Sequence, residues 1–257
     1  MVEFIVICLF VSIVSYLGFL LHALTIGGAV IAFFIGISIG FSFQFSGLFM
    51  LGVFFLTSSF LSLIKKQSNE IVQKGERRDG IQALANGGPA CIFSLLALIF
   101  PESKEQFLHA YIASLAIANG DTWASELGTY STKNPIDVFS LKRVPKGTSG
   151  AISLIGTISG IIGSILIAGC GYLLKLISLS TLWMITIIGC LGLFFDTFLG
   201  ATFQAKYCCQ KCRIQTERKT HCETETIHIK GFKWMNNDVV NFLSILLFSL
   251  LVFFINY

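Results

Sequence analysis

Long apolar stretches separated by shorter polar segments run through the whole chain. A helix needs about 20 apolar residues to cross a bilayer, and about eight stretches approach that length. They cover roughly residues 2–20, 27–44, 47–64, 81–100, 106–120, 150–174, 181–203 and 238–256. The second and third are weakly separated and could form one re-entrant unit, and the fifth is short. The pattern predicts an all-α fold, a polytopic membrane helix bundle of about eight spans that forms a single integral membrane domain over residues 1–257.

The composition excludes an ordinary soluble domain. Hydrophobic residues make up 54% of the chain and charged residues 12%, and the mean hydropathy is +0.78. A soluble domain carries roughly one quarter charged residues, so this chain has too few charges to cover a water-facing surface. A cleavable signal peptide is not expected, because residues 1–20 lack a basic start and are followed by further apolar stretches.

The basic residues predict the orientation. Sixteen of the 18 lysines and arginines fall in three segments, 65–80, 121–149 and 204–237, and the other two are Lys104 and Lys175. Eight spans place all three segments on one side, which the positive-inside rule assigns to the cytosol. We therefore expect a multi-pass membrane protein whose active face is cytosolic. Nothing points to nucleic acid as a partner, and a homo-oligomer stays open.

Two carboxylates stand at the end of the fifth stretch, in LAIANGDTWASELGTYS (115–131). Asp121 and Glu126 would diverge by about 140° on a continuous helix, since each residue turns about 100°. A helix break at Gly120 would let them converge, and Asn119 adds a neutral oxygen. Hard oxygen ligands of this kind suit Mg²⁺ together with substrate phosphates. The alternative is a plain helix end, at which Asp121 caps the next element.

A basic segment rich in glycine and hydroxyl groups, LKRVPKGTSGAIS (141–153), precedes the sixth stretch. It supplies Lys142, Arg143, Lys146, Gly147, Thr148 and Ser149. Backbone N–H groups at a helix N-terminus bind anions, and basic side chains can clamp phosphate charge. The segment lacks the Walker A spacing but predicts a nucleotide-phosphate site. The alternative is a capped helix whose basic flank only sets the topology.

Two further polar groups lie in the C-terminal third. Asp196 interrupts an apolar stretch in GLFFDTFLGATFQ (192–204), and an intramembrane carboxylate is costly unless it is paired, hydrated or protonated. The last stretch opens with Asn237, Asp238 and Asn241, of which the last two share a helix face. We interpret Asp196 as a catalytic candidate and the other three as cofactor-binding, although Asn and Asp at a helix start are also ordinary caps.

The segment GERRDGIQALANGG (75–88) is the candidate acceptor site. It places Arg77, Arg78 and Asp79 at a membrane edge, and Gln82 and Asn86 four residues apart on one helix face. Such groups could line a head-group pocket. The alternative is that they form hydrogen bonds between helices.

Four of the eight cysteines cluster in the polar segment 204–237, which we interpret as a cytosolic insert. In YCCQKCRIQTERKTHCE (207–223), a structural Zn²⁺ site can be closed by three thiolates and an imidazole, those of Cys209, Cys212, Cys222 and His221. His221 and Cys222 are adjacent and make an awkward ligand pair, so His228 or Cys208 are alternatives. Disulfides are disfavoured in a cytosolic loop.

Five ordered motifs together resemble the multi-spanning membrane proteins known as domain of unknown function 92, a family that includes transmembrane protein 19 and the phytyl-phosphate kinase of plastids. They are GERRDGIQALANGG, ANGDTWASELG, RVPKGTSGAIS, FDTFLGATFQ and NNDVVNFLS. GDTWASELG followed by KGTSG is also distantly similar to signatures of CTP-using phosphatidate cytidylyltransferases and polyprenol kinases. This resemblance implies that Asp121 binds Mg²⁺, with Glu126 beside it, and that Lys146, Thr148 and Ser149 contact phosphates. The glutamate that follows the Lys-Thr pair in the cytidylyltransferases is absent here.

The residues and the resemblance predict an enzyme, a kinase that passes a phosphoryl group from a CTP-like nucleoside triphosphate to a phytyl or prenyl monophosphate. Asp121, Lys146 and Asp196 are the expected catalytic residues. Alternatives with the same parts are a lipid cytidylyltransferase and a prenol kinase. A transporter for lipid phosphates would use intramembrane ionisable groups and broken helices. A non-catalytic scaffold would leave Asp121 and Lys146 dispensable.

Overall fold

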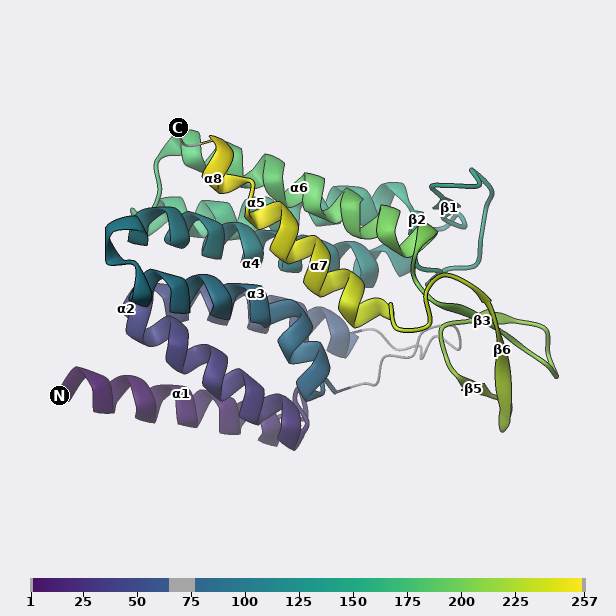
Figure 1. Cartoon of the computed structure of the whole chain (residues 1–257), viewed down its shortest axis with the longest axis horizontal. Helices are drawn as coiled ribbons and strands as arrows, with labels where there is room; N and C mark the ends of the chain where they lie inside the picture. Colours follow the sequence, from purple (N-terminus) through teal and green to yellow (C-terminus); the bar gives the residue numbers. More distant parts are fainter. Residues whose placement is uncertain (1, 65–76, 256–257) are drawn as a thin grey trace.

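The computed structural model describes residues 2–64 and 77–255 of the chain and forms a helical bundle with short strands at one end (Figure 1). The helices are α1 (Val2–Leu20), α2 (Ile26–Ile64), α3 (Gly80–Ile99), α4 (Lys104–Leu127), α5 (Leu154–Leu173), α6 (Leu179–Thr202), α7 (Asn237–Ser249) and α8 (Val252–Ile255), with single 3-10 turns at Pro101–Ser103 and Gly128–Tyr130. Within the described residues, six helical segments are long and apolar enough to cross a membrane, and they include every α-helix except α4. The predicted polytopic helical fold is confirmed; the count of about eight spans stays a prediction.

Helix α2 contains both the second and the third predicted stretch. Its backbone leaves the helical conformation at Gln44, where φ is 56° and ψ is −152°. Before this break the helix runs beside α3, where Ile35 faces Gly87. After it the helix runs beside α4, where Ser62 donates a hydrogen bond to Glu126. Because α3 and α4 are antiparallel neighbours, the chain reverses its direction at Gln44 (Figure 1).

Helix α4 lies at the centre of the bundle, and its residues from Ala110 to Gly120 are all buried. The helix break at Gly120 that would let Asp121 and Glu126 converge is absent, because α4 continues without interruption to Leu127. Gly120 serves close packing instead: a Cβ atom there would lie 2.9 Å from the carbonyl oxygen of Gly160 in α5. Small residues at such crossings let two helix backbones approach in lipid. This contact fixes the end of α4 against the start of α5.

A stability test follows from this packing. Gly120→Ala should lower the free energy of unfolding by roughly 1–3 kcal/mol, the usual effect of overpacking a filled interior. Gly169→Ala in α5 is the matched control, because no atom lies within 4 Å of the added Cβ. Thermal unfolding of both variants in detergent checks this. Equal midpoints for the two variants would show that the α4–α5 crossing tolerates a methyl group.

The strands gather at one end of the bundle, on the right in Figure 1. A two-stranded hairpin joins β1 (Ile136–Asp137) to β2 (Ala151–Ile152). A four-stranded antiparallel sheet, called the cysteine sheet below, has the order β4-β3-β6-β5 and consists of β3 (Lys206–Cys209), β4 (Gln215–Thr216), β5 (Thr220–His221) and β6 (Thr224–Lys230). The predicted insert at 204–237 is therefore a folded sheet rather than an irregular loop.

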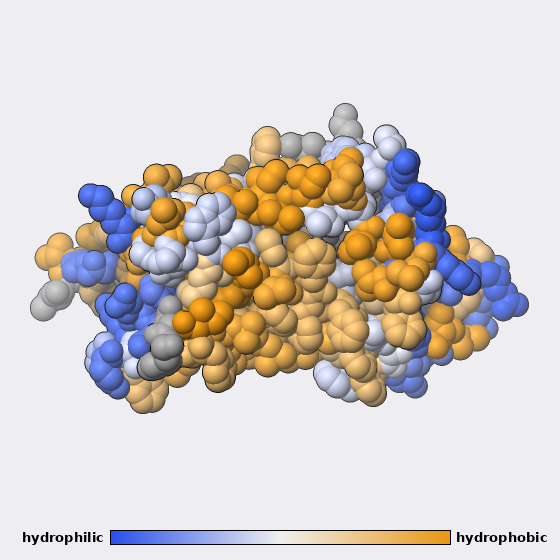
Figure 2. Space-filling view, turned by 90° about the horizontal axis from the view of Figure 1, so that it is seen from above, coloured by the Kyte–Doolittle hydropathy of each residue, from blue (hydrophilic) through white to orange (hydrophobic). Residues whose placement is uncertain are grey.

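Polar and apolar surfaces separate as a membrane requires. The described parts of the three basic segments lie at this strand-bearing end, called the loop end below, whereas Lys104 and Lys175 lie at the opposite end (Figure 1). Lys65, Lys66 and Lys74 fall outside the described residues. In Figure 2 hydrophobic side chains cover the middle of the face and hydrophilic ones cover both ends. That the loop end faces the cytosol stays a prediction.

Candidate active site

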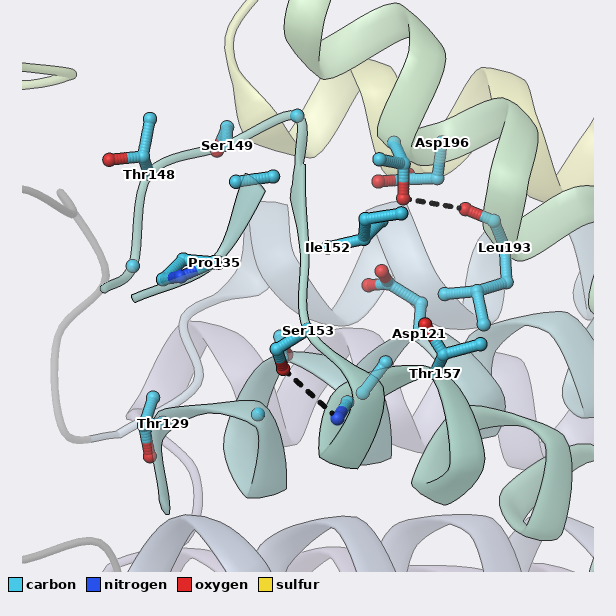
Figure 3. A pocket seen from close by; sticks show the side chains of 18 of the residues that line it. Asp121, Thr129, Pro135, Thr148, Ser149, Ile152, Ser153, Thr157, Leu193 and Asp196 are labelled. Atoms are coloured by element: carbon cyan, nitrogen blue, oxygen red, sulfur yellow. Dashed lines mark hydrogen bonds between the residues drawn. The ribbon is translucent and has the colours of Figure 1, made fainter. Parts of the chain in front are cut away.

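A pocket opens at the loop end between α4, α5, α6 and the loop that joins β1 to β2, with a cavity volume of about 160 Å³. The polar residues and glycines that line it come from four separate segments of the chain. They include Asp121, Ser125, Glu126, Thr129, Lys146, Gly147, Thr148, Ser149, Gly150, Ser153, Thr157, Asp196, Thr197 and Asn237. Figure 3 shows the labelled Asp121, Ser153, Thr157 and Asp196 around this space. All three predicted catalytic residues thus line one pocket.

The two aspartates reach the pocket from different helices. Asp121 lies on α4, directly after the glycine that packs on α5, and Asp196 lies on α6. Because α4 is unbroken, Glu126 points away from Asp121: its carboxylate accepts a hydrogen bond from Ser62 on α2, although it also borders the pocket. The expected convergence of Asp121 with Glu126 through a helix break is therefore corrected, and Asp196 is the carboxylate that joins Asp121 from the opposite wall.

Asp196 belongs to a polar network that joins α6 to α7. Ser244 of α7 donates a 2.9 Å hydrogen bond to its Oδ2 atom. The amide of Asn241, also on α7, lies 3.3 Å from the same oxygen. With its nitrogen facing the carboxylate, Asn241 donates to Asp196. Hydrogen bonds of this kind stabilise an ionised carboxylate inside an apolar bundle.

The pocket wall formed by the glycine loop, residues 145–150, and the start of α5 carries groups that can bind anions. The glycine loop contains two residues with positive φ, Gly147 at 86° and Gly150 at 83°. The Oγ1 atom of Thr148 donates to the carbonyl of Pro145 at 2.8 Å and closes the turn. Helix α5 starts just after this loop, where Ser153 caps the N–H of Gly156 at 3.1 Å. The first N–H groups of a long helix carry positive partial charge and bind phosphate, and Lys146 adds a full charge beside them.

Three of the predicted cofactor-binding residues lie elsewhere. Asn119 is fully buried between helices, where its Oδ1 accepts from Thr57 and Ser58 and its Nδ2 donates to the carbonyl of Gly163 at 2.8 Å. Those bonds direct its amide away from the pocket. Lys142 and Arg143 are exposed on the β1–β2 loop.

Asp238 and Asn241 are also absent from the pocket wall, whereas Asn237 is part of it. Asn236 is the residue that caps α7, because its side chain accepts from the N–H of Val239. The capping residue of α7 therefore directly precedes Asn237, the first of the three predicted polar residues. Asn241 contributes through Asp196, as described above.

The predicted acceptor residues lie at the loop end but not in the pocket wall. Arg78 is half-buried, and its guanidinium lies 5.8 Å from the centre of the Phe54 ring. Burial lowers the pKa of Arg78 to about 10, and the charge of Glu126 opposes this shift. Asp79 caps α3 through the N–H of Gln82. Asn86 donates to the carbonyl of Gln82 within α3 at 2.9 Å, and Arg77 is exposed.

The cysteine sheet brings together the four predicted zinc ligands. One ligand atom from each of Cys209, Cys212, His221 and Cys222 lies within 4.8 Å of all the others. Nδ1 of His221 lies 3.4 Å from the sulfur of Cys212 and 3.2 Å from that of Cys222. The backbone N–H of Cys212, together with the side chain of His221, lowers the pKa of the Cys209 thiol to about 6. Cys208 and His228 lie outside this cluster.

Comparison with known proteins decides the family. A family model described as integral membrane protein DUF92 matches residues 9–249. The chain belongs to this family. The resemblance inferred from the five motifs is thereby confirmed.

Relatives of this DUF92 protein span plants and archaea. Protein PGR of Arabidopsis thaliana is 27% identical over 93% of the chain and 91% of its own length. A membrane protein of Methanocaldococcus jannaschii is 31% identical over 70% of the chain and 73% of its own length. Protein VTE6, chloroplastic, of Arabidopsis thaliana is 25% identical over 90% of the chain and 65% of its own length. No solved structure matches the chain.

Sequence reasoning missed the residues that hold the glycine loop of this DUF92 protein. Ser149 donates to Glu217 through its hydroxyl group and accepts from Gln204 at 3.2 Å. Its carbonyl oxygen accepts from Nζ of Lys206 at 3.0 Å. These partners are 55 to 68 residues away along the chain, so no local pattern could reveal them. Ser153 did carry a signal, since it is a serine directly before an apolar run.

Proposed function

We propose that this DUF92 protein is a membrane kinase that transfers the γ-phosphoryl group of a CTP-like nucleoside triphosphate to an isoprenoid monophosphate. The observation that carries the proposal is the shared pocket: Asp121, Asp196, the glycine loop and the N-terminus of α5 line one cavity at the loop end of an apolar bundle. Phosphoryl transfer depends mainly on positioning and charge neutralisation, and these groups supply both.

Each wall has a distinct role in this proposal. Lys146, the glycine-loop backbone and the start of α5 bind the donor phosphates. Asp121 and Asp196 offer the carboxylate oxygens that Mg²⁺ prefers, so their chemistry fits that ion. When bound, Mg²⁺ neutralises phosphate charge. The Asn241 and Ser244 side chains hydrogen-bond Asp196 and orient its carboxylate toward the pocket.

The lipid acceptor enters from the apolar side of the pocket. Leu193 and Phe194 of α6 line the cavity, and Phe194 is also 44% exposed on the outer surface. This path lets an isoprenoid tail lie along α6 while its phosphate reaches the polar wall. An oxygen of the acceptor phosphate attacks the γ-phosphorus, and the bond from that phosphorus to the β–γ bridging oxygen breaks. A lipid diphosphate and a nucleoside diphosphate result. The family resemblance to the plastid phytyl-phosphate kinase supports an acceptor of this kind.

The test is a lipid-labelling assay on protein purified in detergent. CTP, GTP or ATP labelled in the γ-phosphate is supplied with Mg²⁺ and a panel of prenyl and phytyl alcohols and monophosphates. We expect label in a lipid diphosphate, made only from monophosphate acceptors. Label in a lipid monophosphate would assign an alcohol kinase instead. Transfer from α-labelled CTP alone would assign a cytidylyltransferase, and folded protein that labels no lipid with any donor contradicts the proposal.

A further inference from the structure

We propose that Cys209, Cys212, His221 and Cys222 bind one structural Zn²⁺ ion, and that this ion, through β3 and β4, holds the glycine loop in position. The first half, that an ion is bound, rests on the ligand cluster. The second half, that the ion positions the glycine loop, rests on the contacts between the cysteine sheet and Ser149. Neither half depends on the identity of the reaction in the pocket.

The geometry of the cluster matches a tetrahedral site. Zinc takes thiolate sulfur at about 2.3 Å and imidazole nitrogen at about 2.0 Å, which puts neighbouring ligand atoms about 3.5–3.8 Å apart. The four ligand atoms lie within 4.8 Å of one another, and His221 Nδ1 lies 3.4 Å and 3.2 Å from two of the sulfurs. Three thiolates and one imidazole form a closed structural set, without the open position that a catalytic zinc keeps.

The backbone delivers these ligands in two tight turns. Cys209 ends β3 and Cys212 lies on the turn that follows. This turn is closed by hydrogen bonds between Cys209 and Arg213 and between Cys209 and Ile214, each 3.0 Å long. His221 ends β5 and Cys222 begins the turn to β6. Cys222 and Glu223 have φ of 51° and 59°, a left-handed conformation that side-chain-bearing residues rarely adopt. It allows both members of the adjacent pair to face the same point.

The strands of the cysteine sheet are short and mostly exposed. Two of its strands contain two residues each, and β6 has no buried residue among its seven. Sheets this small bury too little apolar surface to be stable alone, and small folds of this kind rely on metal ions or other cross-links. A metal ion that joins the β3–β4 turn to the β5–β6 turn would tie both outer strands to the central pair.

The cysteine sheet is in direct contact with the glycine loop. Lys206 is the first residue of β3 and Glu217 directly follows β4, and both bond Ser149. The two strands pair through Tyr207 with Thr216. The zinc cluster begins at Cys209, the last residue of β3. The ion would therefore fix the register of β3 against β4, the two strands whose ends contact Ser149.

Metal content is the first measurement. We expect one zinc per chain by mass spectrometry of protein purified under reducing conditions, with a sulfur-rich first shell in the zinc X-ray absorption spectrum. Cys212→Ser should lose most of this zinc. Cys208→Ser is the matched control, because Cys208 lies on β3 directly before Cys209 and outside the cluster. Protein with less than about one tenth of an equivalent of zinc overturns the site, and so does equal zinc loss in both variants.

Limited trypsin digestion tests the second half. Removal of zinc by a chelator should raise the cleavage rate after Arg143 and Lys146 at least about fivefold, because a released loop exposes its backbone to the protease. Cleavage after Lys104 and Lys175, at the opposite end, should stay unchanged. Glu217→Gln should keep its zinc and still show faster cleavage after Lys146. Unchanged cleavage in both the zinc-free protein and this variant overturns the link to the loop.

These readouts stay separate from the kinase proposal, since neither requires phosphoryl transfer. If the lipid-labelling assay gives a product, a third readout is available. Glu217→Gln should then raise the KM for the nucleotide at least about threefold and leave the KM for the lipid unchanged, because Ser149 lies on the donor wall. An equal rise in both constants would contradict a role confined to the glycine loop.

Discussion

If the protein is the proposed kinase, Asp121→Asn is expected to lower lipid phosphorylation at least about 100-fold and to leave the bundle folded, because it removes one of the two aspartates assigned to the metal ion on the donor phosphates. The asparagine is close to the same size, so the α4–α5 packing that begins at Gly120 stays intact. The measurement is the initial rate of label transfer at saturating donor and acceptor. Thermal unfolding of the same preparation reports on the fold.

The control for this prediction is Glu102→Gln, which also removes one negative charge but at the opposite end of the bundle. It should keep the parent rate. The double variant Asp121→Asn/Asp196→Asn should be hardly slower than the slower single variant, since residues that act as one unit are not additive. A fully active Asp121→Asn protein contradicts the metal role, and strictly multiplicative losses contradict joint action of the two aspartates.

Hydrophobic length predicted the bundle well but misplaced the end of α4. The apolar run stops near Gly120, and a glycine followed by an aspartate is typical of a helix end. The structure continues the helix for seven more residues because Gly120 packs against Gly160. The sequence does not show whether Gly120 ends a helix or allows close helix packing, because that depends on Gly160, which lies 40 residues away.

Four of the five ordered motifs contribute residues to the pocket wall, because each of them ends or begins a helix at the loop end of the bundle. Asp121, Asp196 and Lys146 came from three such motifs. What the motifs could not predict is the support behind each group. Asp196 depends on Ser244, 48 residues away, and Ser149 depends on Glu217, 68 residues away. Long-range pairs of this kind are fixed by the folded topology, and short-range periodicity carries no information about them.

Gly150→Ala is the second large effect we expect. Gly150 has a φ of 83°, and an added Cβ would collide with both the nitrogen and the Cα atom of Ala201 at the end of α6. Backbone atoms cannot move aside as the tip of a side chain can, and alanine with positive φ is itself strained. The glycine loop must therefore shift, and the phosphate-binding N–H groups shift with it. We expect transfer to fall at least about 30-fold, since small misplacements in a site can cost about 100-fold.

The origin of that loss can be tested by two comparisons. Gly52→Ala, whose added Cβ has no neighbour within 4 Å, should keep the parent rate and so exclude a general effect of the substitution. Ala201→Gly should fail to rescue Gly150→Ala, because the conflict is with the nitrogen and Cα of residue 201, which glycine retains. Full rescue would place the conflict at the methyl group of Ala201. A Gly150→Ala protein with parent activity would mean that the position of the glycine loop does not control transfer. The donor phosphates would then have to be bound by Lys146 and the start of α5 without the loop backbone.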